Sequence, residues 1–141
     1  MPSTEPEMAT VHVAVGVVIN RDRQILIARR HADQHQGGLW EFPGGKVAGH
    51  ETVQEALKRE LLEEVNISVR ECASLLKIHH DYGDKQVLLD VWYVLVYAGE
   101  ARGCEGQPVR WISVNELDEL EFPAANQDII TAVKALLDSP G

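Results

Sequence analysis

Cysteine is scarce in this sequence, and long apolar runs are absent. Among 141 residues there are two cysteines, Cys72 and Cys104, and they form no CxxC pair. So few thiols exclude a disulfide-rich scaffold, and we expect two reduced, partly buried side chains, with a disulfide between them as the lesser alternative. No apolar stretch reaches membrane-spanning length, and the first ten residues form neither a basic nor a hydrophobic leader. We therefore expect a cytoplasmic protein without membrane contact, and a monomer.

Basic residues are also in short supply. Lysine and arginine total 13 against 22 aspartates and glutamates, which gives a net charge of -9. Binding of duplex nucleic acid depends on Lys and Arg neutralising phosphates, so we expect no duplex partner. A nucleotide remains possible as substrate, because carboxylates can bind divalent cations that in turn hold the phosphates.

The patterning that is present is that of an ordinary globular chain, with 45% hydrophobic residues. We expect residues 1–10 to be a disordered lead and residues 11–141 to form a single domain. The β-branched runs at 11–19 and 24–30 are separated by polar turn residues, which predicts a hairpin. Pro43 and two glycines predict no regular structure for residues 40–45.

The rest of the chain predicts strands and helices in alternation. Strands are expected at 75–80, 87–97 and 109–112, helices at 52–65 and 127–137, and a short helical turn at 114–120. The expected fold is α/β: a central mixed β-sheet between two main helices.

The helix at 52–65 carries an unusual set of acids. At 100° per residue, Glu60, Glu63 and Glu64 overlap the arc of the apolar positions or its edge. Carboxylates turned toward a core repel one another and lose solvation, so cations are expected among them. Oxygen ligation suits Mg²⁺, with Mn²⁺ as a possible substitute. An isolated acidic pair is more often a solvated face, but the coincidence with neighbouring glycines favours a metal site.

The spacing resembles the signature of the Nudix hydrolases. Its positions are matched in order by Gly45, Glu51, Arg59, Glu60, Leu61, Glu63, Glu64 and Ile67. Asn66 replaces the signature's last glycine, and Asn is the next most tolerated residue where a helix ends in a left-handed conformation. The chain further resembles the MutT-type 8-oxo-dGTP diphosphatases in its Arg29-Arg30 pair and in segments 40–46, 105–107 and 122–126. This resemblance implies an α/β/α sandwich.

The resemblance also implies residue roles. Glu60 would activate water, with Glu51 and Arg59 completing the catalytic set. The implied metal ligands are Gly44, through its carbonyl, and the carboxylates of Glu60, Glu63, Glu64 and Glu105. The implied substrate contacts are Arg30, His35, Glu41, Phe42, Pro43, Gly44, Tyr82, Lys85 and Asn126. Tyr82 and Lys85 fall where relatives place an aromatic residue and an arginine near the base, and at both positions this chain has a different residue from theirs.

Three functions are compatible with these features. The first is Mg²⁺-dependent hydrolysis of a nucleoside triphosphate to the monophosphate and pyrophosphate, with 8-oxo-dGTP as substrate, which would keep the oxidised base out of DNA. The second is hydrolysis of CTP, dCTP or a modified pyrimidine nucleotide, because residues 37–42 also resemble those enzymes. The third is a non-catalytic Nudix module that senses a ligand, and retention of every signature acid argues against it.

Overall fold

The computed structural model describes residues 10–30 and 38–138, which form two β-sheets and two α-helices. The first sheet has the order β4-β1-β6-β5 and the second has the order β3-β2-β7. The strands are β1 (Thr10–Val18), β2 (Ile25–Arg29), β3 (Trp40–Glu41), β4 (Gly44–Lys46), β5 (Ser68–Asp81), β6 (Gln86–Ala98) and β7 (Val109–Ile112). The helices are α1 (Val53–Val65) and α2 (Gln127–Asp138), with 3₁₀ turns η1 (Val114–Glu119) and η2 (Ala124–Asn126).

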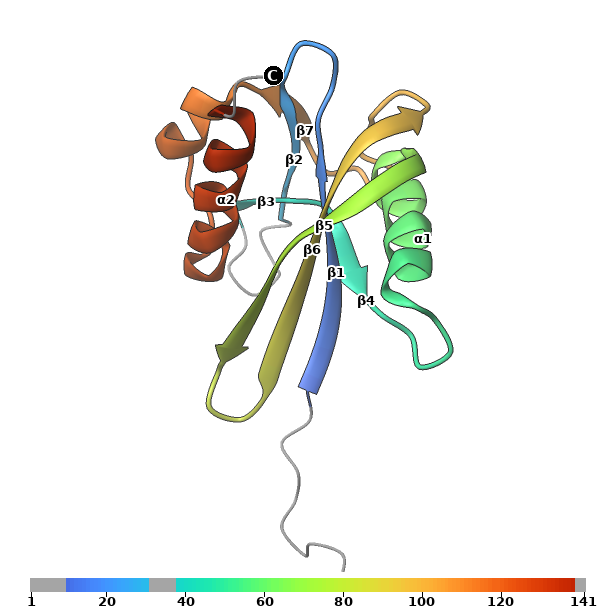
Figure 1. The fold of residues 1–141 in the computed structure, drawn as a ribbon, viewed down its shortest axis with the longest axis vertical. Coiled ribbons are helices and arrows are strands. Elements are labelled where there is room, and N and C mark those ends of the chain that lie inside the picture. Colours follow the sequence, from blue (N-terminus) through green and yellow to red (C-terminus); the bar gives the residue numbers. More distant parts are fainter. Residues whose placement is uncertain (1–9, 31–37, 139–141) are drawn as a thin grey trace, which may run out of the picture.

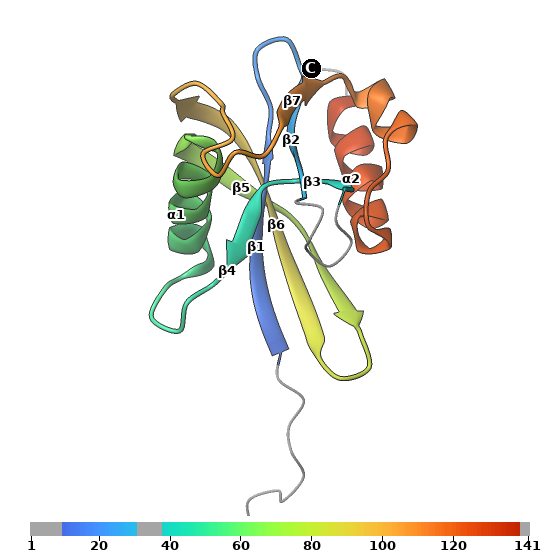
Figure 2. The ribbon, with the colours of Figure 1, turned by 180° about the vertical axis from the view of Figure 1, so that it is seen from behind.

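Helices α1 and α2 lie on opposite sides of the sheets, and the β5–β6 hairpin extends well beyond both (Figure 1; Figure 2 from behind). Each side has its own core. Leu57, Leu61 and Val65 of α1 pack on one side, while Ile129, Ile130 and Val133 of α2 pack on the other. The predicted mixed sheet between two main helices is therefore confirmed, although it is divided into two sheets.

The predicted hairpin of residues 11–19 and 24–30 is wrong as a paired unit. The chain does reverse there, since Asn20 N–H donates to the Gln24 carbonyl at 3.0 Å. Beyond one isolated bridge between Ile19 and Ile25, however, the strands separate into different sheets. Strand β1 pairs instead with β6 in parallel, in a continuous register from Thr10–Gln86 to Val18–Val94. Thr10 is thus part of a strand and not of a disordered lead.

The prediction of no regular structure at 40–45 is also wrong. Trp40 and Glu41 pair with β2, while Gly44 and Gly45 pair with β1. Pro43 lies between the two short edge strands, where its missing N–H costs no ladder hydrogen bond, and its carbonyl accepts from Gly16 N–H at 2.8 Å.

Helix α1 begins and ends where its capping residues dictate. Thr52 is the N-cap, and its side chain accepts from Glu55 N–H at 3.1 Å while the Glu55 carboxylate accepts from Thr52 N–H at 2.9 Å. Asn66 ends the helix in the left-handed region at φ 62°. Asn66 therefore does what was expected of the residue that replaces the signature glycine.

Two further observations bear on the opening expectations. Across residues 10–30 and 38–138, no helix is both long and apolar enough to cross a membrane. Both cysteines are free, and Cys72 is half-buried as expected, but Cys104 is exposed.

Candidate active site

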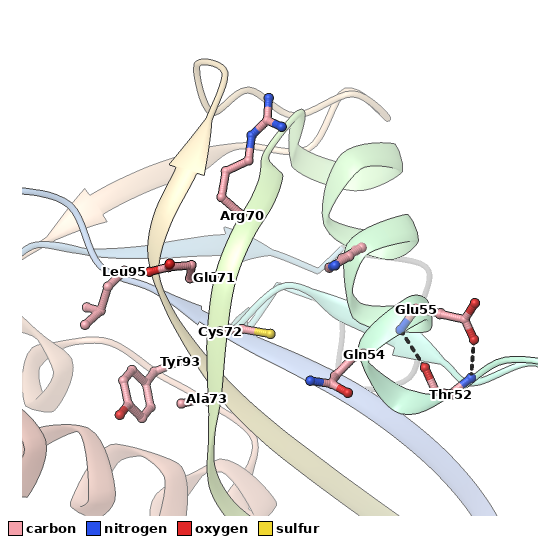
Figure 3. A pocket seen from close by; sticks show the side chains of 10 residues that line it. Thr52, Gln54, Glu55, Arg70, Glu71, Cys72, Ala73, Tyr93 and Leu95 are labelled. Carbon is pink, nitrogen blue, oxygen red and sulfur yellow. Dashed lines mark hydrogen bonds between the residues drawn. The ribbon is translucent and has the colours of Figure 1, made fainter.

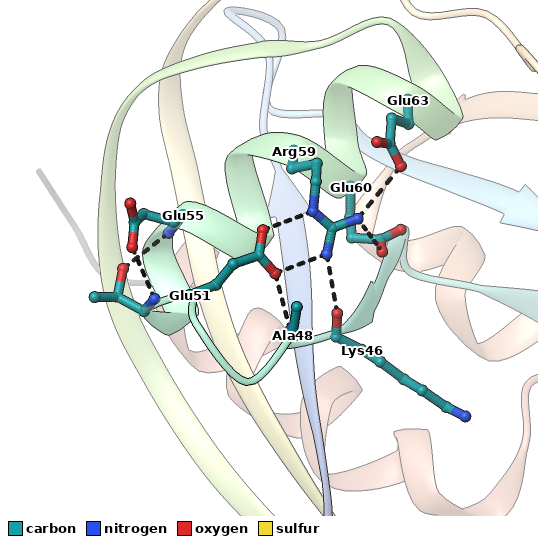
Figure 4. A network of polar contacts seen from close by, with 8 residues as sticks. Lys46, Ala48, Glu51, Glu55, Arg59, Glu60 and Glu63 are labelled. Carbon is teal, nitrogen blue, oxygen red and sulfur yellow. Dashed lines mark hydrogen bonds and ion pairs between the residues drawn. The ribbon is translucent and has the colours of Figure 1, made fainter.

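Arg59 is the centre of the polar network beside α1. Its guanidinium donates to both oxygens of Glu51, at 2.6 and 2.8 Å, and to Glu60 at 2.8 Å. It also reaches Glu63 at 3.4 Å and the Lys46 carbonyl at 3.2 Å, which ties helix, loop and β4 together (Figure 4). Bidentate pairs of this kind fix geometry as well as charge. Arg59 lowers the pKa of the Glu51 carboxyl to about 2.

The two glycines of β4 permit a close approach that no other residue would allow. A Cβ at Gly44 would lie 2.0 Å from the Ala14 carbonyl oxygen, and a Cβ at Gly45 would lie 2.3 Å from the Glu60 carboxyl carbon. The backbone of β4 is thus in van der Waals contact with the Glu60 carboxylate.

The Glu64 carboxyl is largely removed from water, although the residue as a whole is half-buried. Burial raises its pKa to about 8, against a hydrogen bond from Gly44 N–H at 3.1 Å that acts in the opposite direction. The negative charges of Glu60, Glu41 and Glu105 raise that pKa further. The three acids around Glu64, which come from α1, β3 and the loop before β7, are therefore close enough to interact with it electrostatically.

The loop that carries Glu105 is anchored to the C-terminal end of α1. Cys104 N–H and the Gln107 side-chain amide both donate to the Glu64 carbonyl, at 2.9 and 3.0 Å. Gln107 also accepts from Glu105 N–H at 2.9 Å. The Glu64 carbonyl, at the end of the helix where intrahelical donors are missing, thus holds the loop of Glu105 near Glu64. The side chain of Glu105 itself is exposed.

A cavity of about 800 Å³ opens between β1, the β5–β6 hairpin and the start of α2. Seven of the expected substrate-contact residues line it: Arg30, Glu41, Phe42, Gly44, Tyr82, Lys85 and Asn126. Its wall includes the half-buried Glu64, while Phe42 stacks on Phe122 with ring centroids 5.4 Å apart. The backbone of Asn126 is held in position by a hydrogen bond from its N–H to the Pro123 carbonyl at 2.9 Å.

Some predicted residues lie elsewhere. Pro43 is buried behind the cavity wall, and His35 lies outside the described residues. The inward orientation predicted for Glu63 is wrong, because its side chain is 59% exposed while that of Glu60 is only 16% exposed. Glu63 lies one helical turn from Arg59 and turns with it toward solvent.

Part of the cavity lining is not predicted by the sequence. Lys46 and Asp84 contribute charge, and Val13, Val15 and Leu89 form an apolar floor. Alternation along β1 was a usable signal for that floor, because Val13 and Val15 point to the same side of a strand. Lys46 and Asp84 lie in a strand end and a hairpin turn, where no periodicity marks them.

The residues present fit a divalent cation in their chemistry. Within residues 10–30 and 38–138, no three His, Cys, Asp or Glu side chains already meet as a ligand set. Glu64 nevertheless has a buried carboxyl whose charged form is disfavoured by burial and by neighbouring acids. A cation beside Glu64 would stabilise the charged carboxylate and so oppose the effects of burial and of the neighbouring acids on its pKa. Hard oxygen donors favour Mg²⁺ or Mn²⁺.

A second cavity, of about 670 Å³, lies along the outer edge of β5 beside the start of α1 (Figure 3). It is lined by side chains of both signs, including Lys58, Arg70 and Glu71, together with the half-buried Cys72. Glu60 and Glu64 are not among its lining residues. Of the four signature carboxylates, Glu64 lines the first cavity and none lines the second.

Clustered acids beside glycines and a cavity are typical of enzymes that act on phosphate groups, and comparison with known proteins identifies the family. The NUDIX domain model matches residues 14–132, so the chain belongs to the Nudix family and is a Nudix hydrolase. Members of this family generally use a divalent metal.

Two curated relatives and one solved structure illustrate the similarity. The chain is 39% identical to the 8-oxo-dGTP diphosphatase of Escherichia coli, over 92% of this chain and 100% of that protein. It is 36% identical to the CTP pyrophosphohydrolase of the same organism, over 82% of this chain and 84% of that protein. A MutT structure, from work on Aliivibrio salmonicida and Vibrio cholerae, has 34% identity and a TM-score of 0.80, covering 90% of this chain and 98% of that one.

Proposed function

We propose that this protein hydrolyses 8-oxo-dGTP to 8-oxo-dGMP and pyrophosphate, with Mg²⁺ as its cofactor. The observation that carries the proposal is the cavity whose lining brings together Glu64, Gly44, Arg30 and Asn126. Acids and an arginine suit the triphosphate, and an apolar floor with an amide suits a nucleobase. The relatives named 8-oxo-dGTP diphosphatase support this substrate.

Asn126 supports the choice of an oxidised purine. Oxidation at C8 turns the N7 of guanine from an acceptor into an N–H donor, next to the O6 acceptor. A side-chain amide offers one acceptor and one donor, so Asn126 can meet both groups of 8-oxoguanine. Unmodified guanine would leave the amide oxygen facing another acceptor, and an unpaired buried polar group of this kind strongly disfavours the wrong substrate.

The chemistry assigned to the acids is hydrolysis by an activated water. When bound, Mg²⁺ would neutralise phosphate charge and lower the pKa of water. Glu60, Glu64 and Gly44 would hold it, with Glu63 and Glu105 joining from the solvent side. Arg59 fixes the Glu60 carboxylate against β4, from where Glu60 would accept the proton of the attacking water.

Attack at the β-phosphorus is part of the proposal. The water oxygen would bond to that phosphorus, and the bond to the oxygen bridging the α- and β-phosphates would break. Hydrolysis in ¹⁸O-labelled water should then place the label in pyrophosphate. Label in the nucleoside monophosphate would assign the attack to the α-phosphorus instead.

A pyrimidine nucleotide is the second candidate, favoured by the similarity to a CTP pyrophosphohydrolase. A pyrimidine would place a smaller ring in the same cavity, and cytosine would offer Asn126 its N4 amino donor and N3 acceptor in place of the N7–H and O6 edge of 8-oxoguanine. Substrate ranking therefore separates the two candidates.

The decisive experiment measures pyrophosphate release from 8-oxo-dGTP, dGTP and CTP at equal concentrations, with Mg²⁺ and with excess EDTA. We expect kcat/KM to be highest for 8-oxo-dGTP and EDTA to abolish turnover. A higher kcat/KM for CTP would transfer the assignment to the pyrimidine. Full activity in EDTA would overturn the metal-dependent reaction itself.

A further inference from the structure

An ion pair lies in the wall of the nucleotide cavity. Arg30 Nη1 and Glu41 Oε2 are 2.5 Å apart, and the two side chains are 25% and 32% exposed. Both residues line the cavity, together with Glu64 and Gly44. The cation expected to bind substrate phosphate is therefore already held by an acid within the same cavity.

The backbone fixes both partners of this pair. Ala28 and Glu41 are register partners in the β2–β3 ladder, and Arg30 N–H donates to the Leu39 carbonyl at 2.8 Å. Trp40 N–H donates to the Glu121 carbonyl at 2.9 Å, which ties β3 to the segment before η2. Glu41 thus contacts Arg30 from a strand that is hydrogen-bonded to β2 and to the segment before η2. The fold therefore determines where the guanidinium lies.

Glu41 lines the same cavity as Glu64 and as Gly44, whose N–H donates to the Glu64 carboxylate at 3.1 Å. The described charged residues of the lining are balanced, with Arg30, Lys46 and Lys85 against Glu41, Glu64 and Asp84. A guanidinium released from Glu41 would find Glu64 as another carboxylate in the same cavity. An Arg30–Glu64 pair would fill the space in which a divalent cation has to bind.

We propose that Glu41 is a positioning residue: its carboxylate holds Arg30 in place for the substrate's phosphates and keeps the guanidinium away from Glu64. This inference rests on the proposed function, because it takes Glu64 as part of the cation site. It assigns the Glu41 side chain to Arg30 and so departs from the expectation that Glu41 contacts the nucleotide directly.

The test is a double-mutant cycle on Arg30 and Glu41 in which the measured quantity is the affinity for Mn²⁺. Binding of Mn²⁺ without nucleotide is followed by the electron paramagnetic resonance signal of the free ion. The proteins are wild type, Glu41→Gln, Arg30→Gln and the double variant. Glu121→Gln is the matched control, since it removes the same charge from an exposed neighbour that does not line the cavity. Thermal unfolding of each protein reports whether the fold is retained.

We expect Glu41→Gln to weaken Mn²⁺ binding on the order of tenfold, in the range found for residues coupled through direct contact. Arg30→Gln should bind Mn²⁺ at least as tightly as wild type, and the double variant should recover most of the loss. Glu121→Gln should match wild type. In turnover, Glu41→Gln should raise the Mg²⁺ concentration for half-maximal rate and the KM, with a smaller effect on kcat.

Two outcomes would overturn the proposal. An equal loss of Mn²⁺ binding from Glu41→Gln in the presence and absence of Arg30 would make Glu41 a direct metal ligand. Unchanged Mn²⁺ binding in Glu41→Gln would remove its link to the cation site. If Glu41→Gln does not fold, Glu41→Asp replaces it, because the shorter carboxylate keeps the charge but loosens its hold on Arg30. A wild type that binds Mn²⁺ but cleaves no nucleotide would instead refute the proposed function.

Discussion

Replacing Gly45 by alanine isolates the contact between β4 and the proposed base. The added Cβ would lie 2.3 Å from the Glu60 carboxyl carbon, where ordinary contact begins at 3.4 Å, so the carboxylate must move by about 1.1 Å. Gly45 is not among the residues with positive φ, so alanine fits the backbone there. Since the clash is with the end of a flexible side chain, we expect folding to survive.

The expected effect is on the chemical step. A misplacement of about 1 Å can cost roughly a hundredfold in rate, equivalent to about 2.7 kcal/mol of activation free energy. We therefore expect kcat to fall about a hundredfold with little change in KM, because Arg30, Phe42 and Asn126 are untouched. The assay is steady-state pyrophosphate release from 8-oxo-dGTP at saturating Mg²⁺, combined with thermal unfolding.

Gly49→Ala is the matched control, because a Cβ at Gly49 meets no atom within 4 Å. It should leave kcat and the melting temperature close to those of wild type. A Gly45→Ala enzyme with wild-type kcat would contradict the proposed role of Glu60 as the base, since catalysis would then tolerate displacement of its carboxylate. A large fall in melting temperature would also contradict it, because the clash would be borne by the fold and not by the side chain.

Three further changes test other parts of the site. Glu60→Gln should lower kcat by about 10²- to 10⁴-fold while leaving the unfolding curve intact, and near-normal turnover would remove Glu60 as the base. Asn126→Ala should lower kcat/KM for 8-oxo-dGTP by at least about tenfold more than for dGTP, and equal losses would assign Asn126 to packing alone. The Glu51–Arg59 pair should stabilise the fold above pH 4.5, the ordinary value for Glu51, and lose that effect as the pH falls toward about 2, because the folded-state pKa is lowered. Urea unfolding should therefore show a steeper loss of stability on acidification for wild type than for Glu51→Gln, and parallel curves would contradict the pairing.

Local chemistry was enough to predict α1 and the central acids. Thr52 with Glu55 forms a capping box, and Asn66 takes the left-handed conformation that the signature glycine would take. These interactions join residues a few positions apart, so the sequence displays them directly. The closing helix α2 was predicted for the same reason, since its buried Ile129, Ile130 and Val133 recur at helical spacing.

Long-range pairing was not visible in the same way. Strand β1 pairs with β6, whose first residue lies 76 positions further along the chain from Thr10, and no turn signal links them. The polar turn predicted at residues 20–23 is confirmed, but the partner of each strand is decided by burial on both sides of the sheets. The same limit applies to Asp84, whose hairpin tip reaches the cavity only because β5 and β6 are long.

The orientation of the acids shows how small angular differences on a helix become differences in chemistry. Glu60 and Glu64 are four residues apart and share the side of α1 that faces β4, where Gly45 and Gly44 contact them. Glu63 is also four residues from Arg59, and it follows that guanidinium to the surface. Arg59 bonds to Glu51, Glu60 and Glu63 together, so it holds the proposed base against β4, while the Glu64 carboxylate accepts from Gly44 N–H instead. The proposed base and the proposed metal ligand therefore lie on the same side of α1 but have separate partners, Arg59 for Glu60 and the Gly44 N–H for Glu64.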